Sequence, residues 1–204
     1  MIKNLFTTPI AYLRVEPETG QLEEVADYLR GLRLRESNEE IKRSNRGGWH
    51  SDGNLFGEEH REFPWLRDLV VKSIIAYAGK GLGFDGEFEF ELTAWAVVNG
   101  AGHYNVPHNH NPFLISGALY IQVPGGMEDG EIVFLDPRTN LNASVPRSLL
   151  QRGQLPPWNR TSIAHTPRCG DLLLFPSWLM HYVNAFTAPD PAAERIVISF
   201  NAGV

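Results

Sequence analysis

Two histidines, His108 and His110, could bind a metal ion in the segment YNVPHNHNPFLISGALYIQV (residues 104–123). Side chains at positions i and i+2 of an extended strand point to the same side, so both imidazoles can reach one cation. Imidazole nitrogens bind divalent ions at about 2.0–2.2 Å, in place of several waters. Because a His-x-His pair also occurs by chance in ordinary loops, the metal assignment depends on a third donor.

The C-terminal part of the chain supplies a third donor and a cationic side chain. GDLLLFPSWLMH (residues 170–181) is typical of a strand, a turn at Pro-Ser and a second strand that begins at His181. In the last predicted strand, RIVISFN (residues 195–201), Arg195 and Ser199 fall on one face. A buried arginine needs an anionic partner, which is either a bound ligand or an Asp or Glu of the core.

A rival metal motif is His50-x-Asp52, which has the spacing that mononuclear iron enzymes use for two of three facial ligands. The motif follows a polar segment (residues 35–48) that ends in a glycine pair, and no β-rich run surrounds it to fix the side chains. The competing interpretation is a surface or lid loop near the entrance of the site. Both interpretations stay open from the residues alone.

Composition excludes several classes of function. The net charge of −6 and the pI near 5.6 leave no basic surface typical of proteins that bind nucleic acids or anionic membranes. The first residues lack the apolar region of a signal peptide, and no apolar run approaches the roughly 18 residues of a membrane span. The lone Cys169 excludes an internal disulfide framework. We expect a soluble, cytoplasmic protein without nucleic-acid or membrane partners.

The order of the predicted elements is helices first and strands afterwards. Residues 5–15 indicate an edge strand interrupted by Pro9, and apolar residues three and four apart predict an amphipathic helix from Gln21 to about Leu34. A second helix is predicted from Pro64 to Ala78, closed by Gly79. With no linker in 204 residues, we expect a single domain (1–204) in which about 1–80 pack on a β-core of about 85–204.

The β-rich part contains one unusual strand and one long connection. Strands are predicted at 88–98, 113–123 and 131–135, besides the C-terminal ones already named. The small residues Ser116, Gly117 and Ala118 leave space beside the histidines, which suggests a ligand pocket. Residues 136–166 form a long, proline-rich excursion of the kind that is usually functional or mobile.

The chain resembles the Fe(II)- and 2-oxoglutarate-dependent oxygenases, in particular a prolyl-hydroxylase-like branch of mostly uncharacterised bacterial and phage proteins. The matching motifs are LFTTPIA, GGWHS, HNHNPFLISGALY, GDLLLFPSWLMH and RIVISFN, in the expected order along nearly the whole chain. The resemblance implies a double-stranded β-helix, or jelly roll, with helices packed outside, thus a mainly β fold with flanking helices (α+β).

The resemblance also implies roles for individual residues. His108 would be the first metal ligand and His181 the distal one. Arg195 would bind the C5 carboxylate of 2-oxoglutarate, assisted by Ser199 and by Tyr120 or Ser116 across the barrel. Fe(II) would chelate 2-oxoglutarate and bind O2, and oxidative decarboxylation to succinate and CO2 would drive hydroxylation of a C–H bond.

The chain departs from this family at one position, since the wider superfamily has Asp or Glu where this chain has His110. If His110 is a ligand, the site consists of three neutral imidazoles. Iron is the metal that the resemblance favours, whereas the general affinity order of divalent ions favours zinc or copper. The lost carboxylate leaves an alternative open, a cupin-like jelly-roll protein that binds a metal and a small ligand without turnover. A three-histidine dioxygenase without a co-substrate is a further possibility, but it gives Arg195 no role.

The remaining expectations concern the pocket and its partners. Candidate pocket walls, each of which could instead be plain core, are Trp95, Asn99, Trp178 and Asn201, and His103 is a candidate for a role near the ligands. The substrate, a small molecule or a peptide, is not specified by the residues of the three loops that we expect to select it, 35–60, 99–107 and 136–166. Exposed edge strands allow a homodimer.

Overall fold

Two antiparallel sheets face each other in the computed structural model, which describes residues 5–36, 43–84, 86, 89–138, 147–148 and 160–203. The large sheet has the order β1 (Ala11–Arg14), β10 (Asp171–Pro176), β6 (Ile115–Gln122), β13 (Glu194–Gly203), β4 (Glu91–Gly100), β3 (Trp49–His50). The small sheet has the order β2 (Asn45–Arg46), β5 (Tyr104–His108), β11 (His181–Val183), β8 (Ile132–Leu135), β9 (Ser162–His165). A separate pair joins β7 (Glu128–Asp129) to β12 (Phe186–Thr187).

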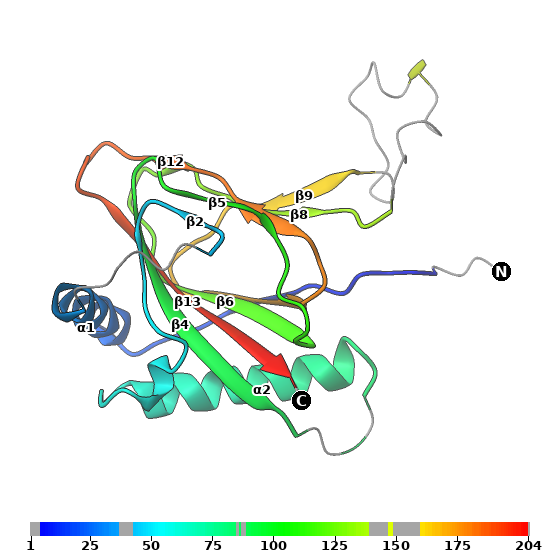
Figure 1. Ribbon diagram of the computed structural model, residues 1–204, viewed down its shortest axis with the longest axis horizontal. Helices are drawn as coiled ribbons and strands as arrows, with labels where there is room; N and C mark the ends of the chain where they lie inside the picture. Colours follow the sequence, from blue (N-terminus) through cyan, green and yellow to red (C-terminus); the bar gives the residue numbers. More distant parts are fainter. Residues whose placement is uncertain are drawn as a thin grey trace.

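Two helices cover the outer face of the large sheet, α1 (Gln21–Arg35) and α2 (Phe63–Lys80), and a short 3-10 turn, η1 (Leu55–Gly57), precedes α2 (Figure 1). The amphipathic pattern of α1 is confirmed, because Leu22, Val25, Leu29 and Leu32 are all buried against the sheet. The second helix is longer than predicted and includes Gly79. It closes instead where the backbone N–H of Gly81 donates to the carbonyl of Tyr77.

Strand β13 separates the helical layer from the space between the sheets. Its outward residues Ile196, Ile198, Phe200 and Ala202 belong to the core beneath the helices. The alternate residues Arg195, Val197, Ser199 and Asn201 line a cavity on the other side. The two-residue period of a strand therefore gives β13 one apolar face and one mostly polar face.

Several predicted boundaries differ from the structure. Only Ala11–Arg14 of the predicted first strand pairs, along the edge of the large sheet, because Pro9 lacks the N–H that a longer ladder would need. The predicted strand 88–98 is displaced to Glu91–Gly100. Antiparallel pairing also produces elements that were not predicted: β2 within the polar segment, which pairs with β5, β9 at the end of the long excursion, which pairs with β8, and the β7–β12 pair. Most of the long excursion lies outside the described residues.

Candidate metal centre and cavity

Three histidines converge between the two sheets. In the small sheet β11 pairs with β5 so that His181 lies opposite His108. His110 lies two residues beyond the end of β5, and its backbone N–H donates to the Ser177 carbonyl at 2.8 Å. One nitrogen from each ring lies within 4.8 Å of the others. Because two donors on one ion lie at most about 4.2 Å apart, small side-chain rotations would place all three nitrogens on one metal.

Backbone carbonyls orient two of the three rings. The Nδ1–H of His108 donates to the Val106 carbonyl at 2.7 Å, and that of His181 donates to the Leu179 carbonyl at 2.9 Å. Each ring thereby keeps the lone pair of Nε2 available for a metal. Hydrogen bonds of this kind fix the tautomer and the orientation of metal-binding imidazoles, so these two side chains fit a metal site.

The ring of His110 contacts a network of polar side chains on the large sheet and the turn after β10. Its Nδ1 lies 3.5 Å from the amide nitrogen of Asn201, whose Oδ1 accepts a hydrogen bond from Ser116 Oγ at 2.7 Å. Ser116 Oγ is also 2.7 Å from Ser177 Oγ. If the Asn201 amide turned by 180°, its oxygen would accept from the Nδ1–H of His110 and its nitrogen would donate to Ser116. That arrangement would leave Nε2 of His110 free to bind a metal.

The buried position of the histidines keeps them uncharged. Burial lowers the pKa of His181 to about 3, with a further contribution from nearby His108. Burial likewise lowers the pKa of His110 to about 4, assisted by His108 and Arg43, and it lowers the pKa of His108. At neutral pH the three rings are therefore neutral, which is the form that binds metals.

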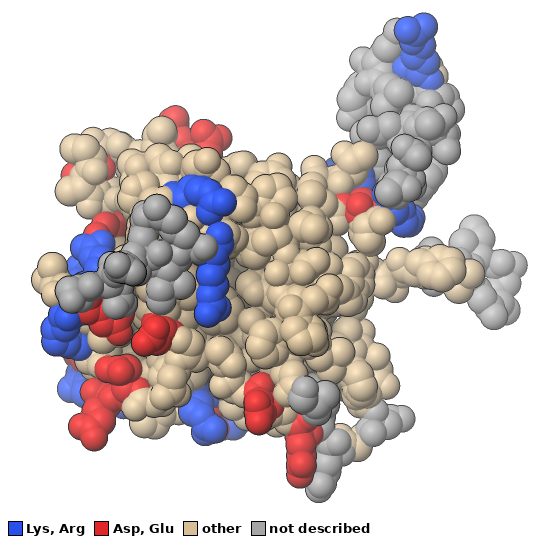
Figure 2. All heavy atoms as spheres, viewed as in Figure 1, with Lys and Arg blue, Asp and Glu red and all other residues tan. Residues whose placement is uncertain are grey.

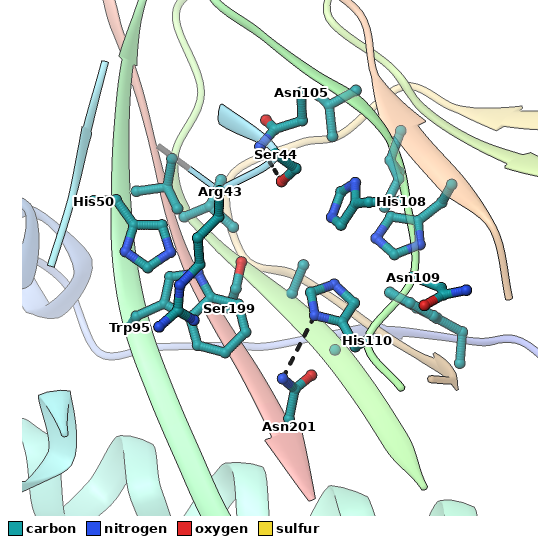
Figure 3. Close-up of a pocket in the computed structure, with 18 of the residues that line it drawn as sticks. Arg43, Ser44, His50, Trp95, Asn105, His108, Asn109, His110, Ser199 and Asn201 are labelled. Carbon is teal, nitrogen blue, oxygen red and sulfur yellow. Dashed lines mark hydrogen bonds between the residues drawn. The ribbon is translucent and has the colours of Figure 1, made fainter. Parts of the chain in front are cut away.

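The histidines lie in a cavity of about 420 Å³ that is bounded by both sheets (Figure 3). Two arginines line it, Arg43 and Arg195, and none of the described residues that line it is Asp or Glu. The other polar lining side chains include Ser44, Ser199, asparagines and His50, and the apolar wall includes Trp95, Val97 and Phe175. The protein groups around the cavity thus carry only neutral or positive charges.

Arg195 is the most deeply buried cation of the cavity, with 1% of its surface exposed. Its Nη1 donates to the Gly130 carbonyl at 2.9 Å, and its guanidinium carbon lies 5.2 Å from the centre of the Phe186 ring. Within the part of the chain that the structure describes, no Asp or Glu forms an ion pair with it. Burial lowers its pKa, but a guanidinium stays protonated in proteins, so a positive charge faces the cavity without an acidic partner.

The structure places the other predicted site residues at different depths. The cavity wall contains Tyr120, Ser199, Trp95, Asn99 and Asn201. Burial raises the pKa of Tyr120 to about 12, although Arg195 lowers it in part, so the phenol keeps its proton.

Three predicted residues lie outside the cavity wall. Ser116 lies beneath the wall in the Asn201 network, and Trp178 is 45% exposed on the surface. The ring of His103 packs near Gly47, and its Nδ1 accepts a hydrogen bond from the N–H of Gly100.

The rival motif divides between two environments. His50 is buried in the cavity wall, where its ring stacks on Trp95 at 5.6 Å, whereas Asp52 is exposed and does not line the cavity. Among the described residues, the group able to hold a metal contains His108, His110 and His181 but neither His50 nor Asp52. The alternative interpretation, a surface or lid loop near the entrance of the site, does not hold for His50, because pairing of β3 with β4 buries it, whereas Asp52 is exposed.

The sequence analysis did not single out Arg43 or Ser44, which lie in the predicted polar loop. They line the cavity just before the chain passes from pairing with β5, at β2, to pairing with β4, at β3, and Gly48 in this crossing has a positive φ of 70°. A Cβ at Gly48 would lie 2.1 Å from Oδ1 of Asn99, so only glycine permits this close approach. The glycine pair itself was the available signal that the preceding residues are pressed against the β-core.

A family model confirms the class of protein. The family described as "Putative 2OG-Fe(II) oxygenase", where 2OG stands for 2-oxoglutarate, matches residues 93–201, more than half of the chain. The chain belongs to this family and is an Fe(II)- and 2-oxoglutarate-dependent enzyme. No curated protein sequence matches it.

Solved structures support the fold. A prolyl-4-hydroxylase from Pseudomonas putida has a TM-score of 0.64 at 14% identity, with 98% of this chain and 94% of that chain covered. A prolyl hydroxylase from Trichoplax adhaerens, solved with a hypoxia inducible factor peptide fragment, has a TM-score of 0.62 at 18% identity, covering 98% and 85%. HygX from Streptomyces hygroscopicus, solved with nickel and 2-oxoglutarate, has a TM-score of 0.60 at 15% identity, covering 97% and 83%.

These likenesses confirm the predicted double-stranded β-helix with flanking helices. No helix in the described part of the chain is long and apolar enough to cross a membrane.

Proposed function

We propose that this enzyme couples oxidative decarboxylation of 2-oxoglutarate to hydroxylation of a second substrate. In this proposal His108, His110 and His181 hold Fe(II), and Arg195 binds the C5 carboxylate of 2-oxoglutarate. The observation that carries the proposal is that Arg195, buried and without a described acidic partner, lines the same acid-free cavity as the three histidines. A buried guanidinium without a counterion calls for an anionic ligand.

The residues of the chain divide the work of the reaction. Bound Fe(II) supplies the redox chemistry by which 2-oxoglutarate, O2 and a substrate C–H bond give succinate, CO2 and an alcohol. Arg195 fixes the far end of 2-oxoglutarate with a charge-assisted pair, and Ser199 and the neutral phenol of Tyr120 line the same space. Trp95, Val97 and Phe175 form apolar wall that limits water around the reacting groups.

Three neutral imidazoles would leave the metal with one more net positive charge than a site that contains a carboxylate. We propose that His110 is compatible with activity because Asn201, Ser116 and Ser177 orient its ring in place of the contacts that a carboxylate would make. We also propose that residues 1–204 act as one catalytic domain, because the helices and the cavity share the large sheet.

Anaerobic thermal unfolding of the metal-free protein, with and without Mn(II) and 2-oxoglutarate, tests the site. Mn(II) should stabilise the wild type, and 2-oxoglutarate at about 100 times its dissociation constant should add about 2.7 kcal/mol when Mn(II) is present. His108→Ala should lose both shifts. Aerobic release of succinate with Fe(II) and ascorbate then tests turnover.

The same experiment has an outcome that would contradict the proposal. Stabilisation by metal alone, without a 2-oxoglutarate shift and without succinate, would contradict the proposal and would favour a jelly-roll protein that binds metal without this reaction. The similar structures were solved with ligands as different as a hypoxia inducible factor peptide fragment and hygromycin B, and the experiment needs no assumption about the second substrate.

A further inference from the structure

The cavity has more positive charge than its co-substrate can neutralise. On the proposed function, Fe(II) and Arg195 contribute three positive charges and 2-oxoglutarate contributes two negative ones. With no Asp or Glu among the described lining residues, one positive charge is left over before Arg43 is counted. A second ligand that fills the rest of this cavity would therefore be favoured electrostatically if it were an anion.

Arg43 adds a further positive charge where solvent reaches the cavity. The residue is exposed and yet lines the same cavity as the histidines. In Figure 3 its side chain extends from the segment before β2 toward the group formed by His50, Trp95 and Ser199. Arg43, His50 and His110 line the same cavity.

No ion pair occupies the Arg43 guanidinium within the described part of the chain. Among the described residues, the side chain of Arg46 donates a hydrogen bond to the backbone carbonyl of Arg43 at 3.1 Å and leaves the Arg43 guanidinium available. Figure 2 shows Lys and Arg side chains gathered over β2, while Asp and Glu lie mainly toward the edges of that face. The surface beside the cavity therefore attracts anions, although the whole chain has a net charge of −6.

His50 supplies a second polar contact beside Arg43. Its Nδ1–H donates to the Ser51 carbonyl at 2.6 Å, and stacking on Trp95 fixes the ring. Burial lowers the pKa of His50, so the neutral ring presents Nε2 as a hydrogen-bond acceptor. A ligand with an anionic group and a nearby hydroxyl or N–H would satisfy both side chains at once.

We propose that the second substrate carries an anionic group, most simply a carboxylate, that pairs with Arg43 at the solvent side of the cavity while 2-oxoglutarate pairs with Arg195. The inference rests on the proposed function and specifies the class of its second substrate. The two arginines thus bind different anions. Arg43, on the loop before β2, binds the second substrate, and Arg195, on strand β13, binds 2-oxoglutarate.

Matched acid and amide probes test this assignment without turnover. Benzoate and benzamide have the same shape and differ in charge, and a flat ring suits a cavity whose lining includes the aromatic side chains of Trp95 and Phe113. Paramagnetic broadening of the probe proton signals in NMR by bound Mn(II), in protein saturated with 2-oxoglutarate, reports binding near the histidines. Phenylphosphonate, in the same titration, distinguishes a phosphate-type anion from a carboxylate.

We expect benzoate to bind wild type at least about fivefold more tightly than benzamide, and Arg43→Gln to reduce the difference to about twofold or less. The control variant Arg67→Gln removes a charge from the exposed surface of α2 and should retain the preference for benzoate over benzamide. In both variants the affinity for 2-oxoglutarate should stay within about twofold of the wild-type value. Much tighter binding of phenylphosphonate than of benzoate would support the anionic class and assign the phosphate type.

Three results would overturn the inference: equal binding of acid and amide to wild type, an unchanged acid preference in Arg43→Gln, or displacement of benzoate by excess 2-oxoglutarate. Failure of Mn(II) or 2-oxoglutarate to bind would instead count against the proposed function. In that case tryptophan fluorescence of the metal-free protein, which contains Trp95 in the cavity wall, still measures the acid preference and its dependence on Arg43.

Discussion

The two arginines of the cavity are held in opposite ways. Arg195 projects from the central strand β13, is almost fully buried, and has a carbonyl and an aromatic ring to fix its guanidinium. Arg43 projects from a connecting segment before the two-residue strand β2 and is exposed. A rigid buried cation suits a ligand that is the same in every turnover, whereas an exposed cation on a loop suits a ligand that differs between relatives.

The largest expected difference is in 2-oxoglutarate affinity. Arg195→Ala should weaken 2-oxoglutarate binding by about 100-fold or more, because a buried charge pair would lose its cation. Arg43→Ala should change it by less than about twofold. Calorimetric titration of the Mn(II)-loaded variants measures both values, and Mn(II) affinity provides the control for folding. Equal losses in the two variants would contradict the division between the arginines.

The burial of His181 in the cavity wall should also make the metal-free protein sensitive to acid. In the unfolded chain a histidine takes up a proton below about pH 6.5, whereas folded His181, with a pKa of about 3, does not. Stability should therefore fall as the pH decreases from 7 to 5, by on the order of 2 kcal/mol for His181 alone.

Urea unfolding of metal-free wild type and His181→Gln at the two pH values measures this effect. The variant should lose less stability between pH 7 and pH 5 than the wild type does. An identical loss in both proteins would show that other groups cause the acid sensitivity.

A carboxylate at position 110 should change both the metal affinity and the preference of the cavity for an anionic ligand. His110→Asp places a negative charge beside the metal, so Mn(II) should bind roughly tenfold more tightly. The same charge should reduce the preference for benzoate over benzamide, although Arg43 is untouched. Competition with a metal chelator and the NMR titration measure the two effects. Tighter metal binding with an unchanged acid preference would show that Arg43, not the total charge of the site, selects the anion.

The smallest expected difference between the two arginines is in how strongly salt weakens the binding of their anions. Raising NaCl from about 0.02 to about 0.5 M shortens the screening length to a few ångströms, which weakens exposed charge pairs more than buried ones. Benzoate affinity should fall several-fold, after correction for any direct effect on benzamide, while 2-oxoglutarate affinity should fall less. A larger loss for 2-oxoglutarate would place its carboxylate, rather than the benzoate carboxylate, near solvent.

Sequence patterns specified the buried parts of the molecule better than the exposed ones. The two-residue period of 195–201 was sufficient to group Arg195 with Ser199, because a strand between two layers has only two faces. The same rule could not assign Ser116, since its strand is buried on both sides. Trp178 follows the Pro-Ser turn, where the strand period no longer applies, and it is exposed.

Residues on connecting segments were missed for a different reason. Arg43 reaches the cavity through the path of a loop, and a polar, charged segment indicates only that it is solvated somewhere along its length. His50 likewise gained its environment from pairing between β3 and β4, a contact between segments nearly 50 residues apart. Neither placement is a local property of the sequence.

The alternation along β13 has a consequence for how this chain can change. Deletion or insertion of one residue near its start would exchange its two faces, so that isoleucines and Phe200 would enter the cavity and Arg195 would meet the helices. Such a change would damage the core and the site together. Point substitutions can therefore explore new chemistry on this strand, whereas changes of length are confined to the loops, where Arg43 lies.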